Sequence, residues 1–277
     1  MFQGKYVFSQ IIDFIPRREF NYFVKLYNGN QRIRNFDCHD QLLAMIFGQL
    51  TNIHSLRGII LCLNAHSNLL YHFGFKSRQY TLSTLSRTNE NRNFKIYQDL
   101  AWLLIGKARK LYINDNDFSI ELNGAVYALD STVIELCPST FKWAYFELGK
   151  SAVKIHTQLD LRGNIPSFFL ITKAKIHDVN FLDILKFETG AFYIMDRGYF
   201  DFERLFKLNQ EGAFFVIRAK DSLSFKRMYS NKVDKEIGLR CDQIIKLKHF
   251  YSRKYFTRKN FDALNITIKK QINTIFI

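Results

Sequence analysis

The sequence predicts an α/β protein in which a mixed sheet follows an all-helical N-terminal region. Up to about residue 111, apolar side chains recur three or four positions apart, which is the helical period. From Ala125 onward the apolar residues alternate or form short runs instead, as strands do. Three of these runs precede a strand–helix–strand unit over 192–217, and this order is typical of a mixed sheet.

Six N-terminal helices are expected, over 8–15, 17–27, 40–50, 56–63, 81–87 and 94–111. Pro16 ends the first, a turn at Asn28-Gly29-Asn30 ends the second, and Asp40 is expected to cap the third.

The stretch 77–92 resembles a helix-turn-helix in style, and its exposed polar side chains suit phosphate and base contacts. The candidate DNA-binding residues are Arg78, Arg87 and Arg92. A polar, solvated helix and loop is the alternative interpretation.

Five strands are expected next, over 126–130, 153–161, 165–172, 192–196 and 213–217. Arg162-Gly163-Asn164 is a hairpin turn, and short helices are expected over 179–185 and 200–209. Beyond residue 220 the pattern weakens to two further strands, over 222–229 and 243–250. The stretch 251–270 is basic and predicts no regular element.

Two of these strands end in an acid. Asp130 follows the apolar run Val126–Leu129, and Asp196 follows Phe192–Met195. An unpaired carboxylate in such surroundings is costly to desolvate, and Mg²⁺, which prefers oxygen ligands, would remove that cost. Two strands that each end in Asp would bring two carboxylates to one sheet edge. The alternatives are a capped buried Asp130 and a turn or salt-bridged Asp196.

Composition excludes several classes of protein. Hydrophobic residues make up 47% of the 277, which argues against disorder. No apolar run approaches the roughly 20 residues of a membrane span, and the N-terminus lacks a signal-peptide hydrophobic region, so a cytoplasmic protein without membrane contact is expected. The four cysteines form no CxxC pair, which predicts reduced thiols rather than a zinc site.

The net charge of +15 is concentrated at the two ends of the chain. Residues 1–92 carry +6 and residues 221–277 carry +8, whereas the segment 93–220, which holds both featured acids, carries +1. Basic flanks around a nearly neutral centre suit a protein that grips a polyanion such as DNA. A generally Lys-rich proteome would give the same total.

Four short stretches follow one another along the chain in an order that is informative about its family: Asp130-Ser131-Thr132, Lys154-Ile155-His156, Ala174-Lys175-Ile176-His177-Asp178 and Asp196-Arg197-Gly198-Tyr199. Their combination resembles the DDE transposases of bacterial insertion sequences, with the IS-four group as the closest match. The N-terminal helices resemble the DNA-binding region that precedes the catalytic domain in that group. The resemblance covers roughly residues 5–250.

The resemblance implies an RNase H-like mixed sheet flanked by helices and a site where two Asp and one Glu hold two Mg²⁺ ions. Asp130 would bridge the metals and Asp196 would be the second acid, with Lys154 and Arg197 contacting DNA. The implied domains are a helical DNA-binding domain over 1–112 and a catalytic domain over 120–277. The implied partners are the terminal inverted repeats of the element and a second copy in a paired-end complex.

The family's third acid lies in a Tyr-x2-Arg-x3-Glu-x6-Lys pattern, which this sequence does not show clearly. Glu236 has the spacing from Tyr229, but the stretch around it reads as a turn. We therefore expect a C-terminally truncated transposase whose strand-rich insertion starts at about residue 221, which would hold the second ion poorly. The alternatives are a non-catalytic DNA-binding remnant and another RNase H-like nuclease. His156 and His177 are candidates to face the substrate phosphate, or else structural histidines.

Overall fold

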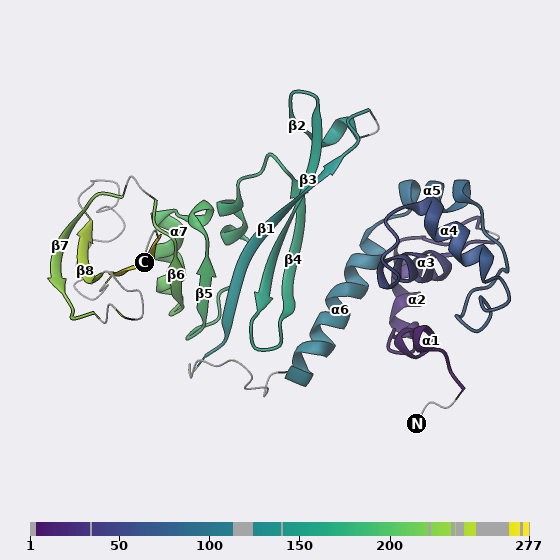
Figure 1. The fold of residues 1–277 in the computed structure, drawn as a ribbon, viewed down its shortest axis with the longest axis horizontal. Helices are drawn as coiled ribbons and strands as arrows, with labels where there is room; N and C mark the ends of the chain where they lie inside the picture. Colours follow the sequence, from purple (N-terminus) through teal and green to yellow (C-terminus); the bar gives the residue numbers. More distant parts are fainter. Residues whose placement is uncertain are drawn as a thin grey trace. The chain divides into compact units, whose positions relative to one another are not determined.

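The computed structural model describes residues 4–33, 35–112, 124–139, 141–220, 223–233, 236, 241–247, 266–271 and 274–276. The chain forms two compact units, Met1–Lys107 and Ala108–Ile277 (Figure 1). Among the described residues no helix is long and apolar enough to cross a membrane.

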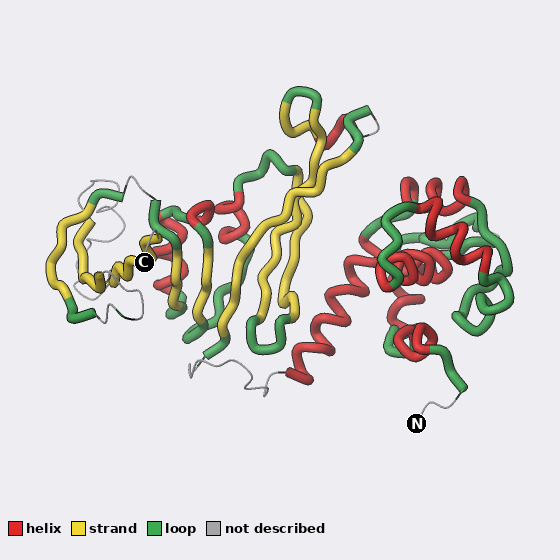
Figure 2. Tube along the Cα trace, viewed as in Figure 1, coloured by secondary structure: helices red, strands yellow, loops and turns green. Residues whose placement is uncertain are grey.

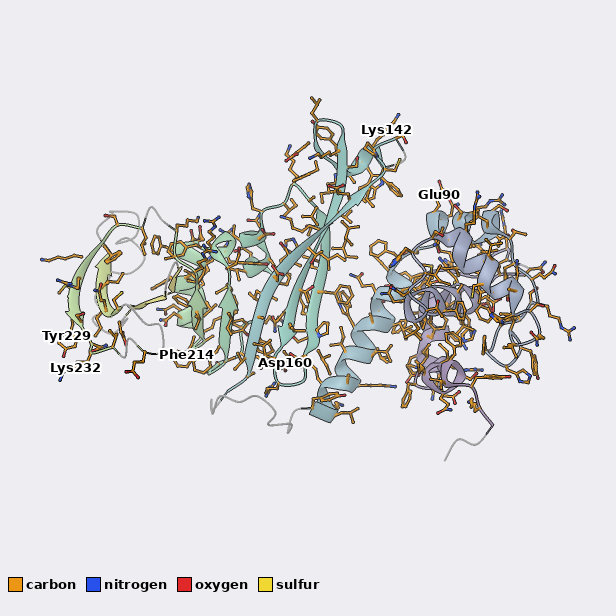
Figure 3. All side chains as sticks on the ribbon, in the orientation of Figure 1. Glu90, Lys142, Asp160, Phe214, Tyr229 and Lys232 are labelled. Carbon is orange, nitrogen blue, oxygen red and sulfur yellow. The ribbon has the colours of Figure 1, made fainter. Side chains whose placement is uncertain are left out.

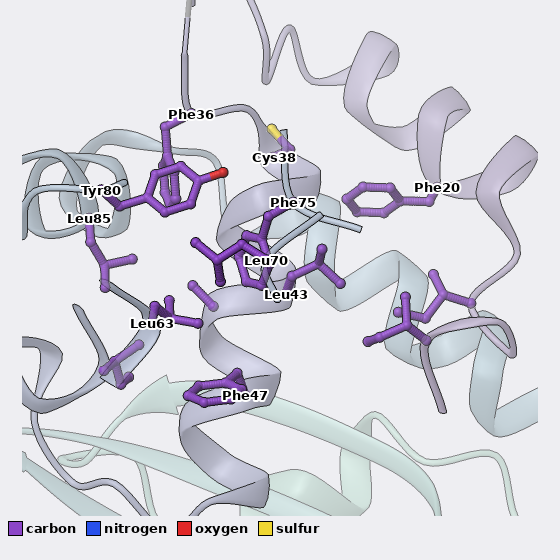
Figure 4. Close-up of a cluster of buried hydrophobic side chains, with 14 of the residues drawn as sticks. Phe20, Phe36, Cys38, Leu43, Phe47, Leu63, Leu70, Phe75, Tyr80 and Leu85 are labelled. Carbon is purple, nitrogen blue, oxygen red and sulfur yellow. The ribbon is translucent and has the colours of Figure 1, made fainter. Parts of the chain in front are cut away.

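The described part of the first unit consists of helices and the loops that connect them (Figure 2). Its helices are α1 (Val7–Ile12), α2 (Arg17–Leu26), α3 (Cys38–Leu50), α4 (Leu56–Ala65), α5 (Leu82–Asn91) and α6 (Lys95–Tyr112), the last of which runs into the second unit. Each matches an expected helix to within a few residues. Their buried faces share one core around Phe20, Leu43, Leu63 and Ile96, part of which Figure 4 shows.

One expected cap is corrected. Helix α3 is capped by Asp37, whose Oδ1 accepts the backbone N–H of Asp40 at 2.9 Å. Asp40 lies inside the first turn and is fully buried. The sequence has an Asp at both positions. Asp37 is the cap because it precedes the helix by one residue, so its side chain can accept the backbone N–H of Asp40, which has no partner within the helix. Ser55 and Thr81 cap α4 and α5 in the same way.

The second unit is built on a six-stranded mixed sheet. The strands are β1 (Val126–Leu136), β2 (Tyr145–Glu147), β3 (Lys150–Asp160), β4 (Ile165–Lys173), β5 (Phe192–Met195) and β6 (Phe214–Ile217). The order β2-β3-β1-β5-β6, with β4 paired to β3, makes β1 antiparallel to β3 and parallel to β5. This confirms the predicted α/β class with a mixed sheet after an all-helical region.

Strand β1 is longer than expected. It continues through Asp130 to Leu136, because its pairing with β3 runs unbroken from Tyr127 opposite Asp160 to Leu136 opposite Ser151. The acid therefore lies inside β1 and not at its end. Only the first part of β1 is paired on both sides, since β5 stops at the level of Leu129.

Short helical segments connect the remaining strands. They are the 3-10 turns η1 (Lys142–Ala144), η2 (Asp178–Asp183) and η3 (Arg197–Tyr199), and the helix α7 (Phe202–Gln210). Residues of η2, η3 and α7 pack on the inner face of the sheet, around Tyr127, Tyr193, Phe181 and Leu205. The outer face keeps apolar side chains exposed, among them Phe214 on β6 (Figure 3).

A second, four-stranded sheet follows. It consists of β7 (Phe225–Ser230), β8 (Cys241–Leu247), β9 (Ile266–Gln271) and β10 (Thr274–Phe276), in the order β10-β9-β8-β7. The first two match the expected strands. Strand β9 lies partly in the stretch 251–270, for which no element was expected. Its sequence pattern does not indicate a strand, and its backbone pairs with β8.

Candidate active site

Asp130 and Asp196 follow equivalent positions of two adjacent strands. In the parallel pair of β1 and β5, Leu129 lies opposite Met195; Asp130 is the next residue of β1, and Asp196 is the first residue after β5. Neighbouring strands lie about 4.8 Å apart, so the backbones of the two acids lie next to each other. Leu129 and Met195 are buried, whereas both acids are exposed. The pair therefore faces solvent at the carboxyl end of β5.

The turn after β5 fixes the Asp196 side chain. Asp196 caps η3, and its Oδ1 accepts the backbone N–H of Gly198 at 2.9 Å. A Cβ on Gly198 would lie 3.0 Å from that oxygen and 3.5 Å from Oδ2 of Asp178. Carboxylate oxygens of Asp178 and Asp196 thus converge on the space that this glycine leaves open.

Asp178 is the acid that sequence reasoning missed. Its Oδ1 accepts the Ser131 hydroxyl at 2.7 Å and pairs with the Lys154 ammonium at 2.9 Å. Burial opposes the charged form, but the hydrogen bonds from Lys154 and Ser131 outweigh it and hold the pKa of Asp178 below its usual value. Asp178 closes the stretch that begins at Ala174, but nothing in that stretch indicates its contacts with Ser131 and Lys154.

Lys154, predicted to contact DNA, is buried inside the second unit. Besides Asp178, its ammonium donates to the carbonyl oxygen of Ile176 at 2.9 Å, and the residue is 8% exposed. A direct DNA contact of Lys154 remains a prediction. Arg197, the other predicted contact in this unit, is exposed and directly follows Asp196.

The two candidate histidines differ in environment. His156 is 1% exposed, stacks on Phe181 at 5.2 Å and shares a hydrogen bond with Thr172 through Nε2. Its Nδ1 is buried without a hydrogen bond, 3.8 Å from Oδ1 of Asp178. Burial lowers the pKa of His156, which favours the neutral ring. His177 is exposed and precedes η2.

Tyr199 completes the inner side of the site. It is 1% exposed, and its hydroxyl makes no hydrogen bond within 3.5 Å. Burial and the nearby carboxylates of Asp178, Asp130 and Asp196 raise the pKa of Tyr199 well above its usual value. A buried phenol of this kind keeps its proton and can donate it to an acceptor that enters the site.

The donor set suits a hard divalent cation. Asp130, Asp178 and Asp196 offer oxygen atoms alone, which Mg²⁺ and Mn²⁺ prefer over softer metals. The oxygens of these three acids do not all lie within 4.8 Å of one another, since the group that meets this limit within the described ranges is Asp37, His39 and Asp40. There the Lys76 ammonium already pairs with Asp37 at 2.5 Å and supplies the positive charge.

The predicted DNA-binding arginines of the first unit lie on and beside α5. Arg78 is exposed in the loop before the helix, and Arg87 is exposed on its surface. Arg92 is half-buried, and its guanidinium donates to Phe36 O, to Asp37 O and to Gln41 Oε1. The stretch 77–92 holds a single helix, α5, and the next helix, α6, begins after a connection of three residues. The resemblance of this stretch to a helix-turn-helix remains a prediction.

Glu236, the weak candidate for the third acid, is exposed between the antiparallel strands β7 and β8. The strands on either side of it belong to the second sheet, whereas Asp130 lies in the first sheet and Asp196 directly follows a strand of the first sheet. Its catalytic role remains a prediction.

Comparison with known proteins identifies two matching families. Residues 122–273 match the model of the transposase DDE domain, and residues 3–76 match a domain of unknown function, DUF4372. The first match covers more than half of the chain and contains Asp130, Asp178 and Asp196.

Three curated relatives are named for transposition. A Sinorhizobium fredii protein whose name assigns it to the transposases (y4zB) is 26% identical over 54% of this chain and 40% of its own length. A Synechocystis protein named for insertion sequence element IS4SA is 24% identical over 53% of this chain and 42% of its own length. A Geobacillus stearothermophilus protein, "Probable transposase for insertion sequence element IS5377", is 25% identical over 55% of this chain and 39% of its own length. The matched part of the chain thus spans about two fifths of each relative's length.

Proposed function

This chain belongs to the DDE transposases of insertion sequences, and from that premise we propose that it cleaves and transfers DNA strands at the ends of such an element with Mg²⁺. The observation that carries the proposal is the pair of exposed carboxylates, Asp130 and Asp196, one residue beyond the same opposed pair of β1 and β5. Two carboxylates on adjacent backbones suit a shared divalent ion.

Asp130 and Asp196 would hold the ion. When bound, Mg²⁺ lowers the pKa of a water or 3′-hydroxyl and stabilises charge on the leaving oxygen. The backbone N–H of Gly198 orients Asp196, and the position of Asp130 inside a paired strand fixes its backbone on one side. Rigid carboxylates reduce the cost of bringing the reacting groups together.

The DNA contacts would come from the basic residues of the helical domain over 1–112. Arg78 and Arg87 are exposed and free to meet phosphates, and exposed Arg197 would meet the strand near the acids. Arg92 would act differently, by fixing α5 to α3 through its bonds to Asp37 and Gln41. The partner would be the inverted repeats of the element, met in the cytoplasm by two copies of the chain in a paired-end complex.

A DNA-binding protein without cleavage is the second candidate. It is favoured by the position of Glu236 between β7 and β8, which belong to a different sheet from β1 and β5. With two acids alone the site would stabilise the transition state less well.

One experiment tests both candidates. The purified chain is incubated with a labelled duplex that carries the element's ends, with MgCl₂, with MnCl₂ and with EDTA. Binding together with metal-dependent nicking that Asp130→Ala and Asp196→Ala abolish is expected for the transposase. Binding with no nicking in either metal supports the second candidate, and nicking that survives Asp130→Ala refutes the assigned site.

A further inference from the structure

We propose that Asp178 is a third carboxylate of the metal site, where its Oδ2 holds a water of the ion bound by Asp130 and Asp196. The inference rests on the proposed metal site. It assigns a positioning role to a residue on η2, outside the two strands that carry the paired acids.

The two oxygens of Asp178 have different tasks. Oδ1 is engaged by the Ser131 hydroxyl and the Lys154 ammonium. Oδ2 points toward the space beside Gly198, where Asp196 Oδ1 also lies. An anchored carboxylate with one oxygen left over is the arrangement by which proteins orient the surroundings of a metal.

The anchor is built from three separate elements. Ser131 lies on β1 directly after Asp130, Lys154 lies on β3, and Asp178 begins η2. The Lys154 ammonium is held in turn by Ile176 O. A charge-assisted hydrogen bond to a nearly buried ammonium is stronger than one made to an exposed lysine, so the Asp178 carboxylate is well fixed.

Two buried polar atoms beside Asp178 lack partners. Nδ1 of His156 makes no hydrogen bond, and the Tyr199 hydroxyl, which feels the charges of all three acids, has no partner within 3.5 Å, although Ser131 lies near enough to oppose the rise of its pKa. Buried polar groups are nearly always hydrogen-bonded, so these atoms indicate that a polar species enters here. A hydrated cation brings water molecules that can accept from the phenol and donate to the ring nitrogen.

The spacing favours a water-mediated role over direct ligation. The oxygens of the three acids do not all fall within 4.8 Å of one another among the described residues. Mg²⁺ and Mn²⁺ bind oxygen at about 2.1 Å, and Mg²⁺ commonly keeps several of its waters. At least one of the three carboxylates therefore reaches a shared ion through a water, and that role suits Asp178, whose Oδ1 is already engaged by Ser131 and Lys154.

The test measures metal affinity instead of activity. Mn²⁺ is titrated into the full-length chain by electron paramagnetic resonance or calorimetry, with circular dichroism to check that each variant is folded. Asp178→Asn is expected to weaken Mn²⁺ binding 10- to 100-fold, as is typical when a group that orients metal ligands is lost. Ser131→Ala, which removes one anchor and keeps the carboxylate, is expected to have a smaller effect in the same direction.

Asp183→Asn is the matched control. Asp183 is another acid of η2, but it pairs with Arg204, so wild-type affinity is expected. If Asp178→Asn is folded and binds Mn²⁺ like the wild type while Asp130→Asn does not bind, Asp178 is purely structural and the inference is wrong. If Asp130→Asn and Asp196→Asn also bind like the wild type, the proposed metal site itself fails.

Discussion

At the scale of single residues, β3 shows where a two-residue period informs and where it misleads. In the sequence Lys154 and His156 alternate with Val153 and Ile155, and the structure places the two pairs on opposite faces of β3. It is the polar face, however, that is buried. The reason is that its partners come from elsewhere in the chain, such as Asp178 for Lys154 and Thr172 for His156. Such pairings depend on tertiary contacts, which local periodicity does not encode.

Asp160, at the end of the same buried row, gives a prediction for acid stability (Figure 3). Burial disfavours its charge, but the side chain and backbone N–H of Arg162 outweigh this and lower the pKa of Asp160. A lowered native pKa stabilises the fold above the unfolded-state value near 3.9, and the gain is lost as the pH falls through the native value.

Asp160→Asn is therefore expected to lower the free energy of unfolding at pH 7 by about 1.5–3 kcal/mol. In urea titrations, the gap from the wild type should narrow below about pH 4. Glu147→Gln removes an exposed carboxylate paired with Lys150 and should cost less than about 1 kcal/mol. A gap that stays constant down to pH 2 would contradict this account of Asp160.

At the scale of elements, the sequence predicted the positions of most helices and strands, but it did not predict β2, β9 and β10, and some predicted ends were wrong. The extension of β1 to Leu136 depends on its pairing with β3, and β9 depends on β8. The two acids could be predicted because each follows an apolar run on a strand. Asp178 could not, because its role depends on a turn that folds back against Ser131 and Lys154.

The junction of β1 and β5 predicts a sensitive glycine. A Cβ on Gly124 would collide with the carbonyl oxygen of Gly190, just before these strands pair. Gly124→Ala should therefore force the strands apart and cost about 1–3 kcal/mol of unfolding free energy. Gly106→Ala, in open space on helix α6, should instead stabilise by up to about 1 kcal/mol. Equal effects of both variants in thermal melts would argue against the close approach.

Helix α5 predicts a separable DNA contact. Arg87→Ala should weaken binding to duplex DNA and reduce the slope of log affinity against log salt by about 1, as expected when one phosphate contact is lost. Lys207→Ala, on α7, removes the same charge from an exposed residue paired with Glu203 and serves as control. Fluorescence anisotropy at several salt concentrations measures both slopes. An unchanged slope for Arg87→Ala would remove α5 from the interface.

At the scale of the whole molecule, the chain consists of two units with separate hydrophobic cores. Sequence alone marked the change from helical to strand periodicity, which falls between these cores. Separate cores unfold independently unless an extensive interface couples them, so calorimetry should resolve two transitions.

Core truncations assign those transitions. Leu43→Ala in the first unit and Leu205→Ala in the second each remove a fully buried side chain, at a cost of about 2–5 kcal/mol. Each variant should lower the midpoint of one transition and leave the other in place. A single transition that both variants shift equally would show that the two units unfold as one.

A substitution at Gly198 would separate the effect of access to the candidate metal site from the effect of the site's charge. A methyl group there would occupy the space on which Asp178 and Asp196 converge, 3.0 Å from the nearest oxygen. Gly198→Ala would therefore act as a plug that leaves every carboxylate, every basic residue and the net charge intact. Genetic screens that compare this variant with acid-to-amide variants could distinguish a host phenotype caused by the protein binding to DNA from one caused by DNA strand cleavage and transfer.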